Sequence, residues 1–314
     1  MDKEILSKID HDNLTELDMK IINFIKKKKE ISKNGECPKP SKLIISTMSG
    51  NSGINKRIDL EKITEILKNN MIKNNSQYML KGIKFKDLNI GETKTERKKR
   101  VIKSNLKKIN RKKKTDKFSN QVTYVINPTG ILKNRNITIK LFRNGNITLT
   151  GIKKKNDGLN CVKFIKNTVE ELRDKVVIDD NEEEIKITKY EITMINSGFS
   201  LNFCINRNKL YEELVKKKIY VSYEPTRYAG VKISYLYNKE DKENKGICKC
   251  KDKCTIEFKS KKKNNCKVVT IAVFEEGNVI ITGGNKIEHI EKGYEFLTKL
   301  CRELYRKIFA LKIE

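Results

Sequence analysis

A ten-residue segment that occurs twice constrains this chain more than any other feature. The two copies are FRNGNITLTG, from Phe142 to Gly151, and FEEGNVIITG, from Phe274 to Gly283. Each copy reads as a strand that ends in an aromatic residue, a Gly-Asn turn that tolerates positive φ, and a β-branched return strand. Apolar residues at helical spacing follow each copy, over Gly158–Lys175 and Ile287–Leu311. A hairpin followed by a helix therefore occurs twice, which indicates an internal duplication.

Further segments recur in the same order around the two copies. They are LIISTMSGNSG (Leu43–Gly53), IDLEKITEIL (Ile58–Leu67) and YMLKGIKF (Tyr78–Phe85) in the first half, and ITMINSGFSLNF (Ile192–Phe203), a helical pattern over Asn206–Lys217 and YEPTRYAGVKISY (Tyr223–Tyr235) in the second. In this order they resemble the two repeats of the TATA-box-binding protein family. That family has a first strand, a helix, a loop called the stirrup, a hairpin and a long final helix. The lysine-, isoleucine- and asparagine-rich composition and two insertions resemble the divergent members of large DNA viruses.

The resemblance implies an α+β fold of two pseudo-symmetric repeats. Together the repeats would form a saddle, a curved antiparallel sheet with helices on its convex face. Residues 1–40 are expected to be an N-terminal helical arm and linker. The first saddle repeat would cover 41–178 with a basic insertion at 92–120, and the second 185–314 with a Cys- and Lys-rich insertion at 238–267.

The same resemblance implies a general transcription initiation factor that binds and bends double-stranded DNA in the minor groove. It would recognise A/T-rich promoter elements and recruit a IIB-like factor and RNA polymerase. One alternative is a protein that coats or packages nucleic acid with little sequence preference, and another is a nucleic-acid enzyme on a related saddle fold. The chain has no HExxH, P-loop, GxSxG or dinucleotide motif, so we expect no enzyme activity.

The resemblance also implies roles for individual residues. DNA wedges map to Phe142 and Phe274 beside the hairpin turns, and to Leu80 and Tyr228 in the stirrups. Groove-lining side chains map to Thr148, Thr150, Ile280 and Thr282, and near the centre to Thr47, Met194 and Asn196. The stirrup surface that meets the IIB-like factor maps to Glu224 and Arg227. The other interpretation of the two phenylalanines is ordinary core packing at the end of a strand.

Several positions depart from the family pattern. Asn146 and Asn278 stand where the family has a lysine after the turn glycine, which removes a phosphate contact from each repeat. Near the centre of the saddle the family places an asparagine in each repeat, where this chain has Thr47 and Met194. Methionine has no hydrogen-bond donor and threonine has one short donor, so relaxed sequence selectivity is predicted.

The charge of the chain favours polyanionic partners. Its formal net charge is +29, and residues 94–117 alone hold 13 Lys or Arg against 2 acidic residues. This segment lacks a sustained apolar period, and we interpret it as a loop that lies along DNA phosphates. The residues expected to bind phosphate are Lys98, Lys99, Arg100, Arg111, Lys112, Lys113 and Lys114. A solvated lysine-rich loop is the alternative.

Four of the eight cysteines are close together in the second insertion. They are Cys248, Cys250, Cys254 and Cys266. Four thiols have the ligand count of a structural zinc site, and neighbouring lysines favour thiolates. The spacing C-x-C-x₃-C-x₁₁-C does not match a pair of CxxC knuckles, so unliganded cysteines on a surface hairpin remain the alternative. No other cofactor is expected.

The sequence shows no apolar run of bilayer length and no signal-peptide pattern at its start, so no membrane partner is expected. We therefore expect an intracellular protein, located in the nucleus if it is cellular and in the virus factory or virion if it is viral. In such a compartment the cysteines stay reduced.

Overall fold

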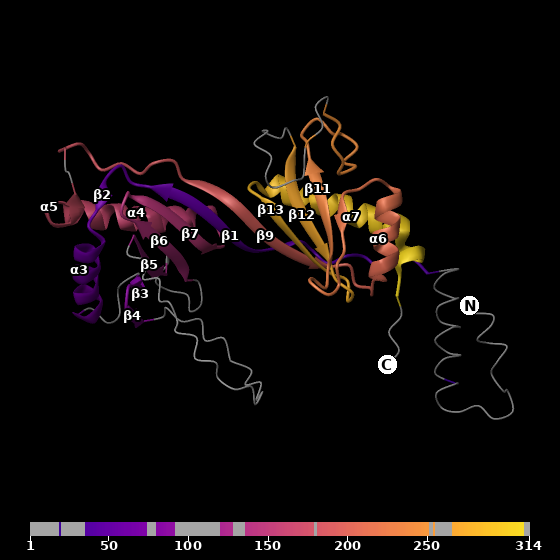
Figure 1. The fold of residues 1–314 in the computed structure, drawn as a ribbon, viewed down its shortest axis with the longest axis horizontal. Coiled ribbons are helices and arrows are strands. Elements are labelled where there is room, and N and C mark those ends of the chain that lie inside the picture. The colour runs from indigo at the N-terminus through magenta and orange to yellow at the C-terminus, as the bar shows by residue number, and fades with distance from the viewer. Residues whose placement is uncertain are drawn as a thin grey trace. The chain divides into compact units, whose positions relative to one another are not determined.

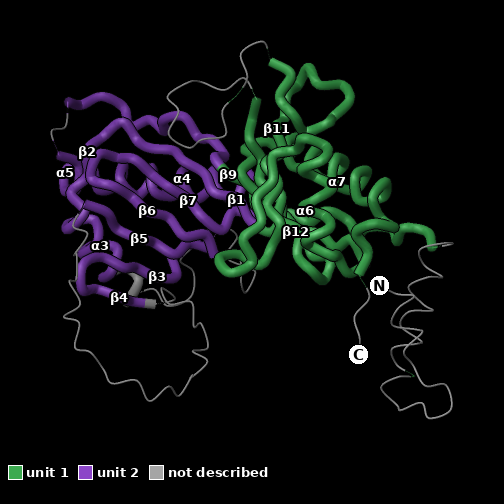
Figure 2. The backbone as a smooth tube through the Cα atoms, turned by 45° about the vertical axis from the view of Figure 1, so that its right-hand side comes forward, with its two compact units in different colours: residues 1–46, 194–314 green, residues 47–193 purple. Residues whose placement is uncertain are grey.

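The computed structural model describes Met19 and residues 35–73, 80–91, 120–127, 136–178, 181–250, 254 and 266–310. The chain divides into two compact units, which Figure 2 shows in green and purple. Unit 1 contains residues 1–46 and 194–314, and unit 2 contains residues 47–193. Apart from Met19, the expected N-terminal arm up to residue 34 lies outside the described residues. No helix in the described part of the chain is long and apolar enough to span a bilayer.

Unit 2 is built on an antiparallel sheet with the strand order β1-β7-β6-β5-β3-β4. Its elements are β1 (Ile44–Gly53), β2 (Arg57–Ile58), α3 (Leu60–Lys73), β3 (Leu80–Phe85), β4 (Leu88–Gly91), β5 (Gln121–Ile126), β6 (Ile137–Phe142), β7 (Asn146–Ile152), α4 (Lys155–Glu171), α5 (Arg173–Val176) and β8 (Val177–Ile178). The short strands β2 and β8 pair separately. The helix predicted over Gly158–Lys175 is interrupted at Leu172, between α4 and α5.

Unit 1 contains five strands that pair in the order β10-β11-β12-β13-β9. Its elements are β9 (Glu191–Ser200), α6 (Arg207–Lys216), β10 (Val221–Ser222), β11 (Val231–Tyr237), β12 (Lys267–Val273), β13 (Asn278–Gly284) and α7 (Ile287–Ile308). Figure 1 shows α6 and α7 beside these strands. In both units the first strand, β1 or β9, pairs with the last strand, β7 or β13. The other edge of that last strand pairs with its hairpin partner, β6 or β12. The predicted duplication and the α+β class are therefore confirmed.

The repeated segment explains the hairpin geometry in both units. The turn glycines Gly145 and Gly277 have φ of +81° and +77°, and each donates its N–H to the carbonyl of the phenylalanine at the end of the preceding strand. This is a type I turn closed by a left-handed glycine. The last glycine of each copy, Gly151 or Gly283, has φ of +91° or +93° and lies where the register with the first strand shifts. Such bulges bend and twist a strand, so the repeat encodes both the turn and the local curvature.

The core of each unit lies between its helices and one face of its sheet. In β13, Val279 and Ile281 are buried, while Asn278 and Ile280 on the opposite face are exposed. The long helix α7 buries a stripe of residues at helical spacing against β11–β13, for example Leu297. The other face of each sheet carries no helix among the described residues. We call it the open face.

The unit boundary differs from the predicted end of the first repeat at 178. Residues 181–193 pack on unit 2, since Thr188 donates its backbone N–H to the carbonyl of Gly53 at 2.8 Å and Ile187 bridges to Ile54. This connecting segment therefore stays with the first repeat.

Candidate nucleic-acid interface

The open face of unit 1 is nearly free of charge. By the alternation of side chains along the strands, it carries Lys232, Ser234, Thr270, Ala272, Asn278, Ile280, Thr282, Met194, Asn196 and Gly198. Lys232 is the one charged residue in this set, in a chain of which 35% is charged. Ile280 and Met194 are 43% and 38% exposed, although both are large and apolar. An exposed apolar face in so charged a chain indicates a contact surface.

One polar contact orders the middle of this open face. The Thr282 hydroxyl donates a hydrogen bond to Oδ1 of Asn196, its partner across β13 and β9. The amide Nδ2 of Asn196 has no hydrogen-bond partner within the described part of the chain. The pair therefore presents an N–H donor beside short, β-branched side chains.

Two aromatic rings stand at the end of the open face. Phe274 follows β12, Tyr228 precedes β11, and their ring centroids lie 5.7 Å apart. Both rings are half-buried and pack against Gly230, where a Cβ atom would lie 3.0 Å from the Tyr228 ring and 3.1 Å from the Phe274 ring. Lys232 Nζ lies 4.1 Å from the centroid of the Tyr228 ring, within cation–π range. The predicted wedge pair of this repeat is thus brought together, with a positive charge beside it.

Arg207, the first residue of α6, fixes the loops that carry these rings. It donates hydrogen bonds to the backbone carbonyl of Ala229 at 2.6 Å and to the carboxylate of Glu275 at 2.5 Å. Its guanidinium also lies 5.8 Å from the Tyr223 ring centroid. One planar side chain therefore ties the stirrup (Tyr223–Gly230) to the hairpin turn.

We expect Arg207→Lys to lower the free energy of unfolding by about 1 kcal/mol, because an ammonium cannot replace the two-pronged contact. Urea denaturation measures this change. Hydrogen exchange at the Tyr228 amide, which bonds the Glu224 carbonyl at 2.9 Å, should become faster. The matched control is Arg227→Lys, since the ion pair of Arg227 with Glu224 joins side chains that are 82% and 63% exposed. That control should stay within about 0.5 kcal/mol of the parent. Equal losses in both variants would contradict the role of Arg207.

The open face of unit 2 carries the first set of groove-lining residues. Thr148 pairs with Asn51 and Lys140, and Thr150 pairs with Ser49 and Thr138. Asn51 and Ser49 occupy the places that Gly198 and Asn196 hold in unit 1. The sequence alignment missed Asn51, whose exposed amide lies opposite Thr148.

Phe142 is half-buried at the hairpin end of the unit 2 sheet. Shallow hollows flank it, one lined by Arg57 and Asn120 and the other by Asn51 and Thr148. No aromatic ring from the described residues packs against Phe142. Its neighbour Arg143 pairs with Glu61 of α3 at 3.0 Å, and a hydrogen bond from Lys86 holds the pKa of Glu61 below its usual value.

The prediction that Leu80 is a wedge beside Phe142 is wrong. Leu80 is 2% exposed and pairs with Ile126, whereas Phe142 pairs with Gln121 at the other end of β5. The segment expected to be the stirrup is instead strand β3. It turns at Lys86, with φ of +50°, into β4. A buried side chain at the far end of the sheet cannot insert between base pairs at the hairpin end.

The order of the strands relates the two units. β5 and β11 occupy the same place beside the hairpin, so the residues that precede β5, and not β3, correspond in this order to the stirrup before β11. In the sequence the basic segment lies between β4 and β5, whereas the insertion of unit 1 follows β11. The seven predicted phosphate-binding residues lie outside the described residues.

The remaining predicted residues differ in accessibility. Thr47 is half-buried, and its hydroxyl oxygen is buried without a hydrogen-bond partner among the described residues, so this hydroxyl does not lie open on the face. Asn146 and Asn278, at the turns, are exposed, as are Glu224 and Arg227. The cysteines at 248, 250, 254 and 266 come together, with all four Sγ atoms within 4.8 Å of one another.

Comparison with known proteins supports the resemblance that the repeated segments indicated. No protein-family model matches the chain. A protein of Acanthamoeba polyphaga mimivirus described as "TATA-box-binding protein-like" is 32% identical to it over 218 residues. The chain resembles a viral TATA-box-binding-like protein. The match covers 66% of this chain and 54% of the mimivirus protein, so the chain spans about half the length of that relative.

Among solved structures, the Methanococcus jannaschii TBP matches with a TM-score of 0.44 and 17% identity. That match covers 84% of this chain and 99% of the archaeal chain.

Proposed function

We propose that this chain is a transcription initiation factor that binds double-stranded DNA in the minor groove and bends it at A/T-rich promoter elements. The observation that carries the proposal is the open face of unit 1, a nearly uncharged and partly apolar sheet surface that ends in the Tyr228–Phe274 pair. Similarity to the mimivirus TATA-box-binding protein-like protein supports it.

The open face has the chemistry that a widened minor groove requires. Ile280 and Thr282 present short branched side chains to base edges, and the Asn196 amide offers a donor to the acceptors that A·T pairs show there. An apolar wedge that enters a base step unstacks it and kinks the duplex. The TATA-box-binding protein is itself the standard example of this mechanism. The cost of unstacking, a few kcal/mol per step, therefore comes from that class and not from this chain.

Positive charge at the end of the open face and in the basic segment would hold the phosphates. Lys232 lies beside the wedge pair, and the basic segment 94–117 contributes Lys98, Lys99, Arg100, Arg111, Lys112, Lys113 and Lys114. These contacts would compensate for the two phosphate contacts that the family makes with lysines at the positions of Asn146 and Asn278. Affinity should therefore fall steeply as salt rises.

The exposed stirrup of unit 1 would meet a IIB-like factor, and through it RNA polymerase. Glu224 and Arg227 form a solvent-open ion pair on this loop and present both signs of charge to a partner. Since Thr226 and Arg227 depart from the family's residues, that partner would be correspondingly divergent. The chain would act by binding rather than by catalysis, in the nucleus or virus factory where the promoter lies.

The second candidate is a protein that coats or packages nucleic acid without sequence preference. The net charge of +29 favours it, because electrostatic binding to phosphates reads no sequence. The two candidates predict different relative affinities for A·T-rich and G·C-rich duplexes.

A competition assay distinguishes them. The competitors are a TATA-type duplex, a shuffled A·T duplex with the same number of TA steps, and a G·C duplex. We expect the first two to bind within about 1.4 kcal/mol of each other, a tenfold ratio, and the G·C duplex to bind more weakly. The reason is that Met194 supplies no donor and the Thr47 hydroxyl is buried, so DNA deformability dominates the discrimination.

Equal binding of all three duplexes would favour the coating protein and refute the promoter factor. A preference of roughly a hundredfold or more for the TATA order would instead show that direct readout is retained, with Asn196 and Asn51 as the available donors.

A further inference from the structure

The cysteine cluster in the insertion between β11 and β12 has the geometry of a metal site. Cys250 Sγ lies 3.6 Å from Cys266 Sγ and 4.0 Å from Cys254 Sγ, and all four sulfurs lie within 4.8 Å of one another. A disulfide would bring two sulfurs to about 2.05 Å, and all four cysteines are free thiols. Tetrahedral zinc with Zn–S bonds of about 2.3 Å places its sulfurs about 3.8 Å apart. The observed separations lie around that value.

The sulfurs also receive the hydrogen bonds that thiolate ligands need. The backbone N–H of Cys254 donates to Cys248 Sγ at 3.3 Å, and the side-chain amide of Asn238 donates to Cys250 Sγ at 3.6 Å. Donors of this kind orient metal-bound thiolates and stabilise their charge. Neutral thiols on a surface hairpin carry no charge and would not require such donors.

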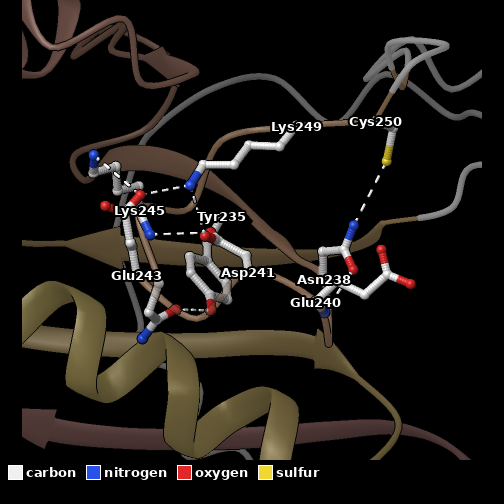
Figure 3. A network of polar contacts seen from close by, with 9 residues as sticks. Tyr235, Asn238, Glu240, Asp241, Glu243, Lys245, Lys249 and Cys250 are labelled. Carbon is white, nitrogen blue, oxygen red and sulfur yellow. Dashed lines mark hydrogen bonds and ion pairs between the residues drawn. The ribbon is translucent and has the colours of Figure 1, made fainter.

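A polar network fixes the chain that leads into the cluster, and Figure 3 shows it together with the Asn238–Cys250 hydrogen bond. Lys249 pairs with Asp241 at 3.2 Å and with Glu243 at 2.6 Å. The carboxylate of Asp241 also accepts the backbone N–H of Lys245 at 3.1 Å. Asn244 joins the Tyr235 hydroxyl to the carbonyl of Lys292 in α7. These contacts anchor the segment before Cys250 to unit 1, so two of the four cysteines are held in place before any metal binds.

The cluster lies on the open face. Cys254 and Cys266 are buried against Leu236, and Cys248, Cys250 and Val268 complete the same cluster. Leu236 and Val268 are cross-strand partners on the face that also bears Thr270 and Ala272. They lie at the opposite end of β11 and β12 from Phe274.

We propose that Cys248, Cys250, Cys254 and Cys266 bind one structural zinc ion as a tetrahedral tetrathiolate. Each thiol releases its proton on binding, so the site is charged and needs the N–H donors around it. The zinc ties the insertion over Leu236 and Val268. It thereby caps the open face at the end away from the aromatic pair and limits the length of sheet that faces a ligand. The metal site does not depend on the proposed DNA function.

Metal analysis of the full chain tests the proposal directly. Protein purified under reducing conditions without chelator should contain about one zinc ion per chain. X-ray absorption at the zinc edge should give about four sulfur ligands at ~2.3 Å. Cobalt(II) in place of zinc should give the absorption bands of a tetrahedral thiolate site.

The variants are Cys250→Ser and the matched control Cys204→Ser, whose half-buried cysteine is not part of the cluster. After dialysis, Cys250→Ser should retain about tenfold less zinc per chain than the parent, and Cys204→Ser should retain as much as the parent. Should Cys250→Ser not fold, the spectroscopy of the parent chain decides the question. Zinc below roughly a tenth of an equivalent in the parent after titration with excess zinc would overturn the proposal. So would a spectrum with nitrogen or oxygen ligands, or unchanged zinc in folded Cys250→Ser.

Discussion

Replacing Phe274 with alanine is expected to weaken DNA binding about a hundredfold and to remove the bend, while the fold stays intact. The ring is half-buried at the end of the open face and packs on Tyr228 and Gly230 rather than in the core. Its loss removes the side chain that would offset the unstacking of a base step. Energy transfer between dyes at the two ends of a duplex measures the bend, and thermal unfolding measures the fold. Phe142→Ala should behave similarly.

The control for this experiment is Leu80→Ala, which truncates a fully enclosed side chain of unit 2. It should cost about 2–5 kcal/mol of stability and leave the bend unchanged in the molecules that remain folded. If Phe274→Ala instead melts as early as Leu80→Ala and still bends DNA, the Phe274 ring is a core residue and the wedge assignment fails.

Gly277→Ala is expected to lower the free energy of unfolding by about 3–5 kcal/mol, because two penalties add. The residue has φ of +77°, which an L side chain rarely adopts, and a Cβ atom would lie 2.2 Å from the carbonyl oxygen of Phe203. That oxygen belongs to the backbone and cannot rotate away. Urea denaturation gives the change in free energy.

The matched glycine is Gly293 in α7, where a Cβ atom would meet Ile271 and Ile281 at 3.6 Å, an ordinary contact. Gly293→Ala should raise stability by about 0.5–1 kcal/mol through helix propensity. A Gly277→Ala variant within about 1 kcal/mol of the parent would show that the hairpin turn relaxes at little cost. The turn would then not explain why the glycine recurs at Gly145.

The sequence predicted the elements that depend on local patterns. Both hairpins follow from the repeated aromatic, glycine and asparagine, and α7 from a long apolar stripe that begins at Ile287. The left-handed turn glycines were predictable for the same reason, since few other residues adopt that conformation.

Features that depend on long-range pairing were not predictable. The sequence predicts a stirrup where the structure has β3, because the turn into β4, at Lys86 and Asp87, lacks the Asn-Gly or Asp-Gly signal of a hairpin. Without that hairpin, nothing in the sequence places Leu80 in the interior. Four cysteines are visible in the sequence, but their convergence depends on their packing against Leu236 and Val268, which the sequence does not show.

The ion pairs at the two hairpin turns have a consequence for the history of the chain. In unit 2 the turn supplies the cation, Arg143, and the helix the anion, Glu61; in unit 1 the turn supplies the anion, Glu275, and the helix the cation, Arg207. Exchange of the two hairpins between the repeats would place arginine against arginine and glutamate against glutamate. The two hairpins are thus no longer electrostatically interchangeable. Recombination between the coding sequences of the two repeats would place like charges against each other at both hairpin turns.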